Sequence, residues 1–178
     1  MSSSSFDSDP QKSLGELKIR SKILVKAANN GGADAVKKLS AIVKADPPYQ
    51  HKDGLKYVAR TAGFRDWQHA AHILSGNAKV GEDMGTLWYS RKCMALLNIW
   101  CRDYNEALEE LSKRSNVYLL PYKRQFIIVD DDFMRALGLL PQGRPNGPST
   151  NRDLIQNYGT EEWDNLTFSR LQDALGPT

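Results

Sequence analysis

The sequence predicts an α+β fold that is mainly helical: a four-helix N-terminal module followed by a helical unit with one β-hairpin. Residues 13–76 place apolar side chains at helical spacing in four short runs, and Gly, Asn or Pro separates one run from the next. Residues 117–129 contain two runs of aliphatic and aromatic residues separated only by Lys123-Arg124, as in two antiparallel strands. The predicted sheet therefore lies in the second half of the chain.

Length and composition predict a globular protein that needs no disulfides. The chain has 178 residues, of which 40% are hydrophobic and 25% are charged, enough to bury a core. We expect a disordered leader over residues 1–12, a polar, glycine-bearing linker over 77–86 and a second unit over 87–178. No apolar run approaches the roughly 18 residues that a membrane span requires, so we expect no membrane partner.

A capping signal and an apolar stripe predict the first helices. Ser13 and Glu16 have the spacing of a capping box, in which each side chain bonds a free N–H at the start of a helix. The face that we expect to be buried behind them consists of Leu17, Ser21, Ile23, Leu24, Ala27 and Ala28. A second helix, over about 34–45, is expected to stop at Pro47-Pro48 because proline lacks the N–H donor.

Residues 55–74 give the clearest pattern, a helix, a tight turn and a second helix. Gly63 and Phe64 are expected to form the turn. Asp66 is placed to cap the second helix with its carboxylate, and Trp67 is large enough to anchor that helix in a core. These four residues are therefore interpreted as a structural motif.

The apolar run over residues 91–100 is interpreted as a helix that is buried on several sides. On a continuous helix, Cys93 and Cys101 would lie about 12 Å apart along the axis, too far for a disulfide. We therefore expect two buried free thiols and a reducing, cytoplasmic location.

The remaining elements follow from the same rules. We expect a helix over 102–114, strands over 117–122 and 125–129, a helix over 133–139 opened by Asp130-Asp131-Asp132, and a last helix that begins at Thr160-Glu161-Glu162. Pro121 predicts an edge position or a bulge, because proline cannot donate to a strand ladder. A flexible loop is expected over 141–150.

The positive charge is concentrated in the first half of the chain. Residues 11–80 carry thirteen Lys/Arg and five Asp/Glu, a net charge of +8, whereas residues 81–178 carry eleven and fourteen, a net charge of −3. This asymmetry can mark a face that binds nucleic acid, although solvated lysines on amphipathic helices give the same count.

Two places offer candidate contacts to a protein partner or to DNA. The helix pair resembles a helix-turn-helix in outline, and its second helix carries or adjoins Arg65, Gln68, His69 and His72, side chains that can bind phosphates and base edges. Asp66 and His69, however, fall where a helix-turn-helix has apolar core residues.

The hairpin presents Lys123 and Arg124 between aromatic residues. This arrangement suits base stacking or the uptake of a partner strand, and it equally suits a half-buried strand with a charged turn.

Metal and covalent chemistry receive little support from the residues. His69 and His72 are spaced to face one way on a helix and His51 could join them, but no compact ligand motif is present. Three consecutive aspartates, Asp130 to Asp132, cannot all face one ion, so helix capping accounts for them better. Neither cysteine has a histidine in its half of the chain to act as a base. The sequence therefore predicts no cofactor and no catalytic residue.

The segment Gln50 to Ala59, QHKDGLKYVA, followed by AGFRDW at 62–67, resembles a small bacterial helical domain. Its members read roughly S-H-S-Q-A-L-E-L-x-A and then H-G-[FY]-R-D-W-N-x-L, and the domain is called glyoxalase-related. The resemblance covers about residues 13–76. It implies a helical accessory module of bacterial proteins, and it does not imply lactoylglutathione chemistry, because the βαβββ units of a glyoxalase enzyme are not predicted here.

Our leading functional hypothesis is a non-enzymatic binding protein of the bacterial cytoplasm. It would be an accessory or regulatory factor, for example of a chromosome or a mobile element, that acts through contacts with a protein partner. The alternative is direct DNA binding through the helix pair, as an antitoxin or a regulator. A third hypothesis is a metal-dependent enzyme that uses the histidines or the Asp130 cluster. The sequence does not predict an oligomeric state.

Overall fold

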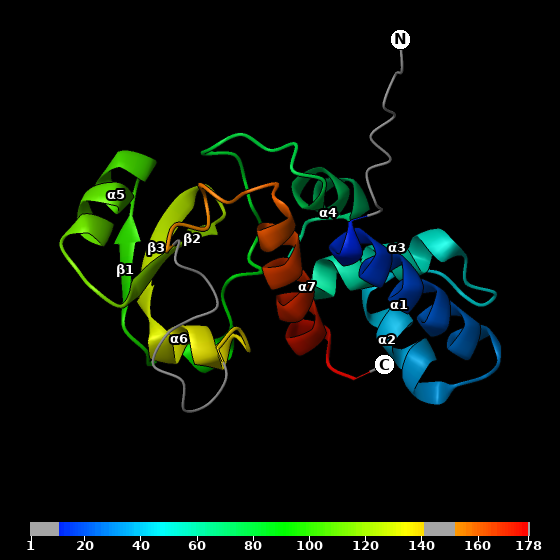
Figure 1. Cartoon of the computed structure of the whole chain (residues 1–178). Coiled ribbons are helices and arrows are strands. Elements are labelled where there is room, and N and C mark those ends of the chain that lie inside the picture. The colour runs from blue at the N-terminus through cyan, green and yellow to red at the C-terminus, as the bar shows by residue number, and fades with distance from the viewer. Residues whose placement is uncertain (1–10, 141–151, 178) are drawn as a thin grey trace, which may run out of the picture.

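The structure, a computed structural model, describes residues 11–140 and 152–177. Its elements are α1 (Lys12–Asn29), α2 (Ala33–Ile42), α3 (His51–Thr61), α4 (Trp67–Leu74), the 3-10 turn η1 (Arg91–Cys93), β1 (Asn98–Cys101), α5 (Tyr104–Ser112), β2 (Val117–Tyr122), β3 (Gln125–Asp130), α6 (Asp131–Ala136) and α7 (Glu161–Leu175) (Figure 1). The prediction of a mainly helical α+β fold is confirmed. Most of the predicted leader and the predicted loop over 141–150 lie outside the described residues.

Four helices form the N-terminal part, as predicted. α1 packs along α3 and α2, and α4 adjoins α3. Leu17, Ser21 and Ala28 are buried on α1, but Ile23 is 48% exposed and Ala27 is also exposed, so the buried stripe of α1 is narrower than we expected. α1 contacts α2, α3, α4 and α7, and its exposed residues lie on the face that these helices leave uncovered.

The predicted capping box at Ser13 is wrong. α1 begins at Lys12, so its N-cap residue is Gln11, two residues before Ser13, and Gln11 makes no side-chain cap bond. Asp164 of α7 bonds the start of α1 instead: its carboxylate accepts from the backbone N–H of Lys12 at 2.8 Å and of Ser13 at 3.2 Å. A residue 151 positions away therefore replaces the local cap.

The sheet has three antiparallel strands in the order β1-β3-β2. β2 and β3 form the predicted hairpin, and Pro121 lies on an edge strand, as expected. The third strand, β1, was missed, and the helix predicted over 91–100 is wrong. Trp100 of β1 pairs with Ile127, and Cys101 with Phe126, so this apolar segment completes a sheet rather than a helix.

Helices cover the two faces of the sheet differently. α5 packs on the face that carries Leu119, Phe126 and Ile128. The opposite face, with Leu120, Ile127 and other residues, joins the main core, to which Phe133 and Met134 of α6 also belong. This main core extends from Leu17 of α1 to Leu171 of α7.

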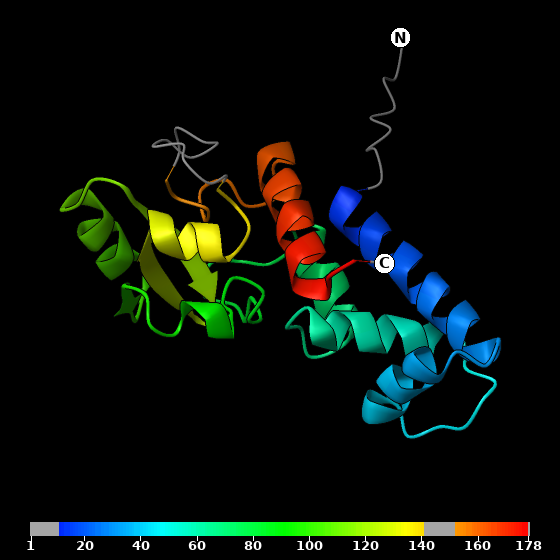
Figure 2. The same ribbon diagram turned by 90° about the horizontal axis from the view of Figure 1, so that it is seen from below.

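α7 follows the sheet in the chain but packs against α1 and α3. In Figures 1 and 2 it lies between the sheet and the N-terminal helices. The indole rings of Trp88 and Trp163, whose centroids are 6.3 Å apart, lie in the main core and connect α7 to the segment before the sheet. Each is at most 1% exposed.

The segment predicted as a linker, residues 77–86, has no helix or strand, but it is tied to both sides of the molecule. Met84 donates its N–H to the carbonyl of Lys123 at 2.9 Å, and Lys123 donates to Gly85 at 2.8 Å. Thr86 donates its N–H to the carbonyl of Gly63 at 2.9 Å. These bonds hold the hairpin turn to the turn between α3 and α4.

Candidate functional site: an aromatic and basic surface

The turn between α3 and α4 is built as the sequence predicts. Gly63 has a φ of 97°, where glycine is favoured, and a Cβ atom there would lie 2.5 Å from Thr86 Oγ1. Phe64 is 4% exposed. Asp66 accepts a bond from the backbone N–H of His69 at 2.8 Å, which confirms the predicted cap. The motif therefore positions α4 against the core and against the segment that leads to the sheet.

His69 is not placed to contact a partner. It is 6% exposed, its Nδ1 accepts from the backbone N–H of Arg65 at 3.1 Å, and its Nε2 lies 2.6 Å from the carbonyl oxygen of Asp83. Nε2 is therefore the nitrogen that donates, since a backbone carbonyl only accepts, and Nδ1 is the one that accepts. Phe64 packs against the ring edge-on. His69 thus fixes the α3–α4 turn, and we leave it out of the candidate contacts.

The other candidate contacts on the helix pair are exposed. Arg65 and Gln68 lie at the start of α4, and His72 lies one turn later. His72 Nε2 is 2.9 Å from the carboxylate of Glu82, and this hydrogen bond holds the pKa of Glu82 below its ordinary value. Arg65 and Gln68 therefore remain open to solvent, whereas His72 has a partner within the chain.

The three histidines and the three aspartates are not gathered at one point. His51 bonds Ser21 at 2.7 Å, apart from the contacts of His69 and His72. Asp130 caps α6 by accepting from the N–H of Phe133, while the two following aspartates pair with Arg135. In the part of the chain that the structure describes, no group of three or more His, Cys, Asp or Glu side chains is placed to share a metal ion.

Both cysteines are free and buried, as predicted, but they do not share a helix. Cys93 lies in η1 and belongs to the main core, whereas Cys101 lies in β1 beneath α5. Burial raises the pKa of each thiol above its ordinary value. A raised pKa keeps a thiol protonated and weakens it as a nucleophile.

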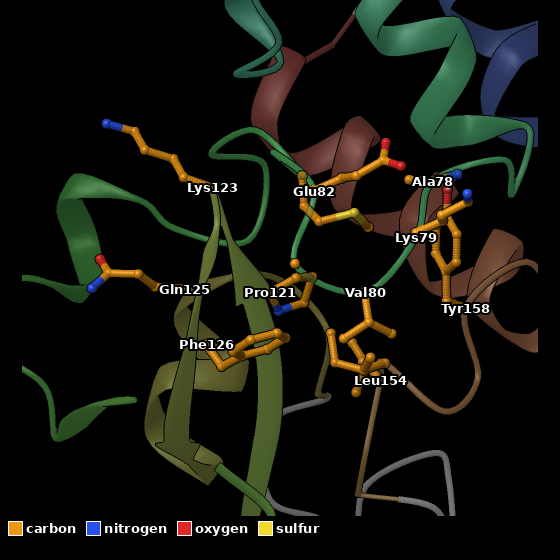
Figure 3. A pocket seen from close by; sticks show the side chains of 13 residues that line it. Ala78, Lys79, Val80, Glu82, Pro121, Lys123, Gln125, Phe126, Leu154 and Tyr158 are labelled. Carbon is orange, nitrogen blue, oxygen red and sulfur yellow. Dashed lines mark hydrogen bonds between the residues drawn. The ribbon is translucent and has the colours of Figure 1, made fainter. Parts of the chain in front are cut away.

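The hairpin turn exposes the two predicted basic contacts, Lys123 and Arg124. Lys123 has a φ of 50°, an uncommon value for a residue other than glycine, and the backbone bonds from Met84 and to Gly85 hold it there. Its ammonium group lies 5.5 Å from the ring centre of Tyr122, within the range of a cation–π interaction. In Figure 3 the side chain extends from the tip of the hairpin away from Val80, Pro121 and Tyr158.

The structure adds an aromatic group that the sequence did not reveal. Trp100 on β1 and Tyr122 on β2 are separated by β3, yet their ring centres are 5.0 Å apart, so the two rings meet over the middle strand. Tyr89 packs against both, at 5.9 Å from Trp100 and 5.5 Å from Tyr122. Trp100 is nevertheless 42% exposed.

Exposed apolar side chains continue this group along the chain. Met94 is 69% exposed and Leu97 is 56% exposed, and both lie in the segment between η1 and β1. Both lie within six residues of Trp100 in the chain, and exposed apolar side chains of this size can mark an interaction site. We call the following residues the aromatic–basic surface: Tyr89, Met94, Leu97, Trp100, Tyr122, Lys123 and Arg124.

The segments that form this surface carry only positive charge. Residues 84–102 and 117–129 contain no Asp or Glu. Their basic residues are Arg91, Lys92, Arg102, Lys123 and Arg124. The surface is therefore complementary to a partner that carries acidic groups.

The two edges of the sheet differ. β2 is covered on its outer side, because Leu119 donates its N–H to the carbonyl of Arg152 at 2.8 Å and accepts from Leu154 at 3.1 Å. β1 pairs with β3 only, and among the described residues no other strand lies beside it. Figures 1 and 2 place β1 on the side of the sheet away from α7. The aromatic–basic surface therefore adjoins an open strand edge.

A pocket on the other side of the hairpin is too small to be the functional site. It lies between residues 78–84, the hairpin and residues 154–158, and Figure 3 shows Val80, Pro121 and Tyr158 around it. Its volume is about 20 Å³, which is room for about one water molecule. The hydroxyl of Tyr158 bonds both the N–H of Ala78 and the carbonyl of Ile73, so this pocket belongs to the packing of the loops.

Sequence reasoning missed Trp100 because the run over 91–100 was interpreted as one buried helix. The last four residues, Asn98 to Cys101, include Ile99 and Trp100, residue types that are common in strands, but four residues are too few to show a strand by periodicity.

None of the helices in the described part of the chain combines the length and apolarity that a bilayer crossing needs. No protein-family model, no curated protein and no solved structure matches the chain.

Proposed function

We propose that the protein is a binding protein that docks an extended, acidic segment of a protein partner on the aromatic–basic surface. The observation that carries the proposal is the position of Trp100, a partly exposed tryptophan on an edge strand; Met94 and Leu97, which precede it in the chain, are also exposed. Buried tryptophan and tyrosine side chains dominate the energy of many protein interfaces.

The open edge of β1 supports an extended partner. A strand that adds to a sheet edge gains backbone hydrogen bonds, and its alternate side chains reach the face of the sheet beside it. On β1 that face carries Trp100, with the ring of Tyr122 next to it. Apolar side chains of the partner would therefore cover these rings, and acidic side chains would meet Lys123 and Arg124.

The aliphatic members of the surface favour a protein over a nucleic acid. Met94 and Leu97 offer apolar contact without a flat ring on which a base could stack. The resemblance of residues 13–76 to a bacterial accessory module also supports a binding role. In this proposal the N-terminal helices support the sheet through the shared core and do not contact the partner.

Selection from a random peptide library tests the proposal. We expect the wild-type protein to enrich peptides in which acidic and apolar residues alternate. Their affinity should fall at least about tenfold in Trp100→Ala, because truncation of an interface tryptophan costs about 2 kcal/mol or more. Ile19→Ala, on an apolar residue of α1 that is 55% exposed against 42% for Trp100, should leave affinity unchanged.

Two results would contradict this function. One is a failure of the library to enrich any peptide. The other is enrichment of peptides that bind wild type and Trp100→Ala equally.

A second candidate function is DNA binding by the helix pair, which the exposure of Arg65 and Gln68 favours. The measurement is a salt titration of binding to random duplex DNA. Phosphate contacts release counterions, so binding through Arg65 should weaken steeply with salt and should lose part of that slope in Arg65→Ala. Binding that shows no salt slope would remove this candidate.

A further inference from the structure

A polar cavity lies at the junction of the α3–α4 turn, the segment after it and α7. Its volume is about 260 Å³, just below the range of about 300–1,000 Å³ that is usual for ligand sites. Its polar lining consists of Thr61, Thr86, Ser90, Lys92, Arg170 and Asp173. It shares Tyr89 with the aromatic–basic surface but includes neither Trp100 nor the basic turn of the hairpin, on which the docking proposed above depends.

Arg170 is the central group of this cavity. Arg170 is 4% exposed, its Nε donates to the carbonyl of Leu87 at 2.8 Å, and its Nη1 donates to Asp173 at 2.7 Å. A guanidinium group has five N–H donors, and Nη2 makes no hydrogen bond to another described residue. Nη2 is not among the fully buried side-chain atoms that lack a partner, so it keeps contact with solvent, and an anion in the cavity could accept a hydrogen bond from it.

The charge of the lining also favours an anion. Asp173 is the only acidic residue in it, and it faces two cations: Arg170 at 2.7 Å and Lys92 at 3.7 Å. Lys92 is 66% exposed on its side chain, so its ammonium group can swing toward a ligand at little cost. Two positive groups and one negative group leave a net charge of +1.

Hydroxyl groups complete the set of donors. Ser90 and Thr61 line the same cavity, as does Thr86, whose hydroxyl already donates to the carbonyl of Gly63 at 3.3 Å. A phosphate group offers at least three acceptor oxygens and a carboxylate two, so several separate donors favour a phosphate. Arginine and lysine are both common phosphate-binding residues.

We propose that this cavity binds a small ligand that carries a phosphate group, held by Arg170 Nη2, Lys92 and the neighbouring hydroxyls. Inorganic phosphate and a small phosphomonoester share this chemistry. A ligand here would contact the α3–α4 turn and α7 together, and would therefore stabilise the folded chain by linkage.

Isothermal titration calorimetry on the full chain tests the site, with inorganic phosphate, glycerol phosphate and succinate as probes. We expect saturable binding of phosphate or glycerol phosphate with one site per chain, and weaker or no binding of succinate. Tighter binding of glycerol phosphate than of phosphate would identify a phosphomonoester as the ligand, and the reverse would identify the free ion.

Lys92→Ala and Arg91→Ala form a matched pair of variants. Both residues are exposed in η1, but only Lys92 lines the cavity. Lys92→Ala should weaken phosphate binding at least about fivefold, whereas Arg91→Ala should not change it. Because Lys92 is exposed, we expect Lys92→Ala to fold, even if a variant of the buried Arg170 such as Arg170→Lys does not.

Three results would overturn the phosphate site: no saturable binding of either phosphate probe, equal binding in Lys92→Ala and Arg91→Ala, or binding of succinate alone. Peptide binding by Trp100 is measured separately and does not depend on any of these results.

Discussion

At the scale of single residues, Asp164 shows how one side chain can determine where a helix begins. Its carboxylate accepts from the N–H groups of Lys12 and Ser13 and from the hydroxyl of Ser13, and Ser13 is fully buried. The first N–H groups of a helix have no partner within the helix, and a carboxylate there also interacts favourably with the helix dipole. Asp164 thus joins α7 to the start of α1.

Asp164→Ala should therefore lower the free energy of unfolding by about 2 kcal/mol, because each buried polar group left without a partner costs about 1–3 kcal/mol. Urea denaturation measures this change. Gln172→Ala, at an exposed position of the same helix, is the control and should change stability by less than about 0.5 kcal/mol. Equal effects of the two substitutions would show that the cap of α1 contributes nothing.

Local contacts of this kind were predictable, and distant ones were not. Asp66, Asp130 and Thr160 each cap the helix that follows within three residues, so the sequence pattern contains the whole interaction. The bond between Ser13 and Asp164 spans 151 positions, and nothing near Ser13 indicates it. His69 was misplaced for a similar reason, since the carbonyl of Asp83 that binds its ring lies beyond the end of α4.

At the scale of elements, the short strand β1 decides how the candidate site is built. Its four residues are too few for periodicity to distinguish a strand from a helix. They form a strand because they pair with β3. Lys123 and Arg124 were identified from the sequence because a charged turn between two apolar runs is a local pattern. Trp100 and Tyr89 could not be joined to them, because only the sheet brings these rings together.

A hydrogen bond between Tyr104 of α5 and Asp153 is a second contact between elements, because residues 152–154 cover the outer side of β2. The hydroxyl of Tyr104 donates to Asp153 at 2.6 Å, and burial, together with this bond, raises the pKa of Tyr104 to about 12. The folded protein therefore favours the protonated phenol. The contribution of this group to stability is complete below about pH 10, the pKa of an unperturbed tyrosine, and is lost as the pH rises toward 12.

We expect Tyr104→Phe to be less stable than wild type at neutral pH, by about 1–3 kcal/mol, because the hydrogen bond to a carboxylate is lost. The difference in urea midpoint should shrink between pH 10 and 12. In an Asp153→Asn background the same substitution should have a smaller effect, since the charged acceptor is already absent. A stability difference that stays constant up to pH 12 would contradict this assignment.

At the scale of the whole molecule, a shared core connects two ends that have different roles in our proposal. Leu17 of α1, Trp88 before the sheet, Ile127 of β3 and Leu171 of α7 belong to one buried cluster. The helices α1–α4 lie at one end, and β1 with its open edge lies at the other (Figures 1 and 2). The sequence predicted the helices and the hairpin, but α7 returns to α1 through contacts between residues far apart in the chain, which no local pattern reveals.

Hydrogen exchange of the backbone amides, with and without a peptide selected from the library, tests the proposed function most directly. If the peptide adds a strand to the sheet, exchange should slow in β1, Asn98–Cys101, and stay unchanged in α2, Ala33–Ile42. Protection that appears instead at the start of α4, around Arg65 and Gln68, with β1 unaffected, would contradict docking on the aromatic–basic surface.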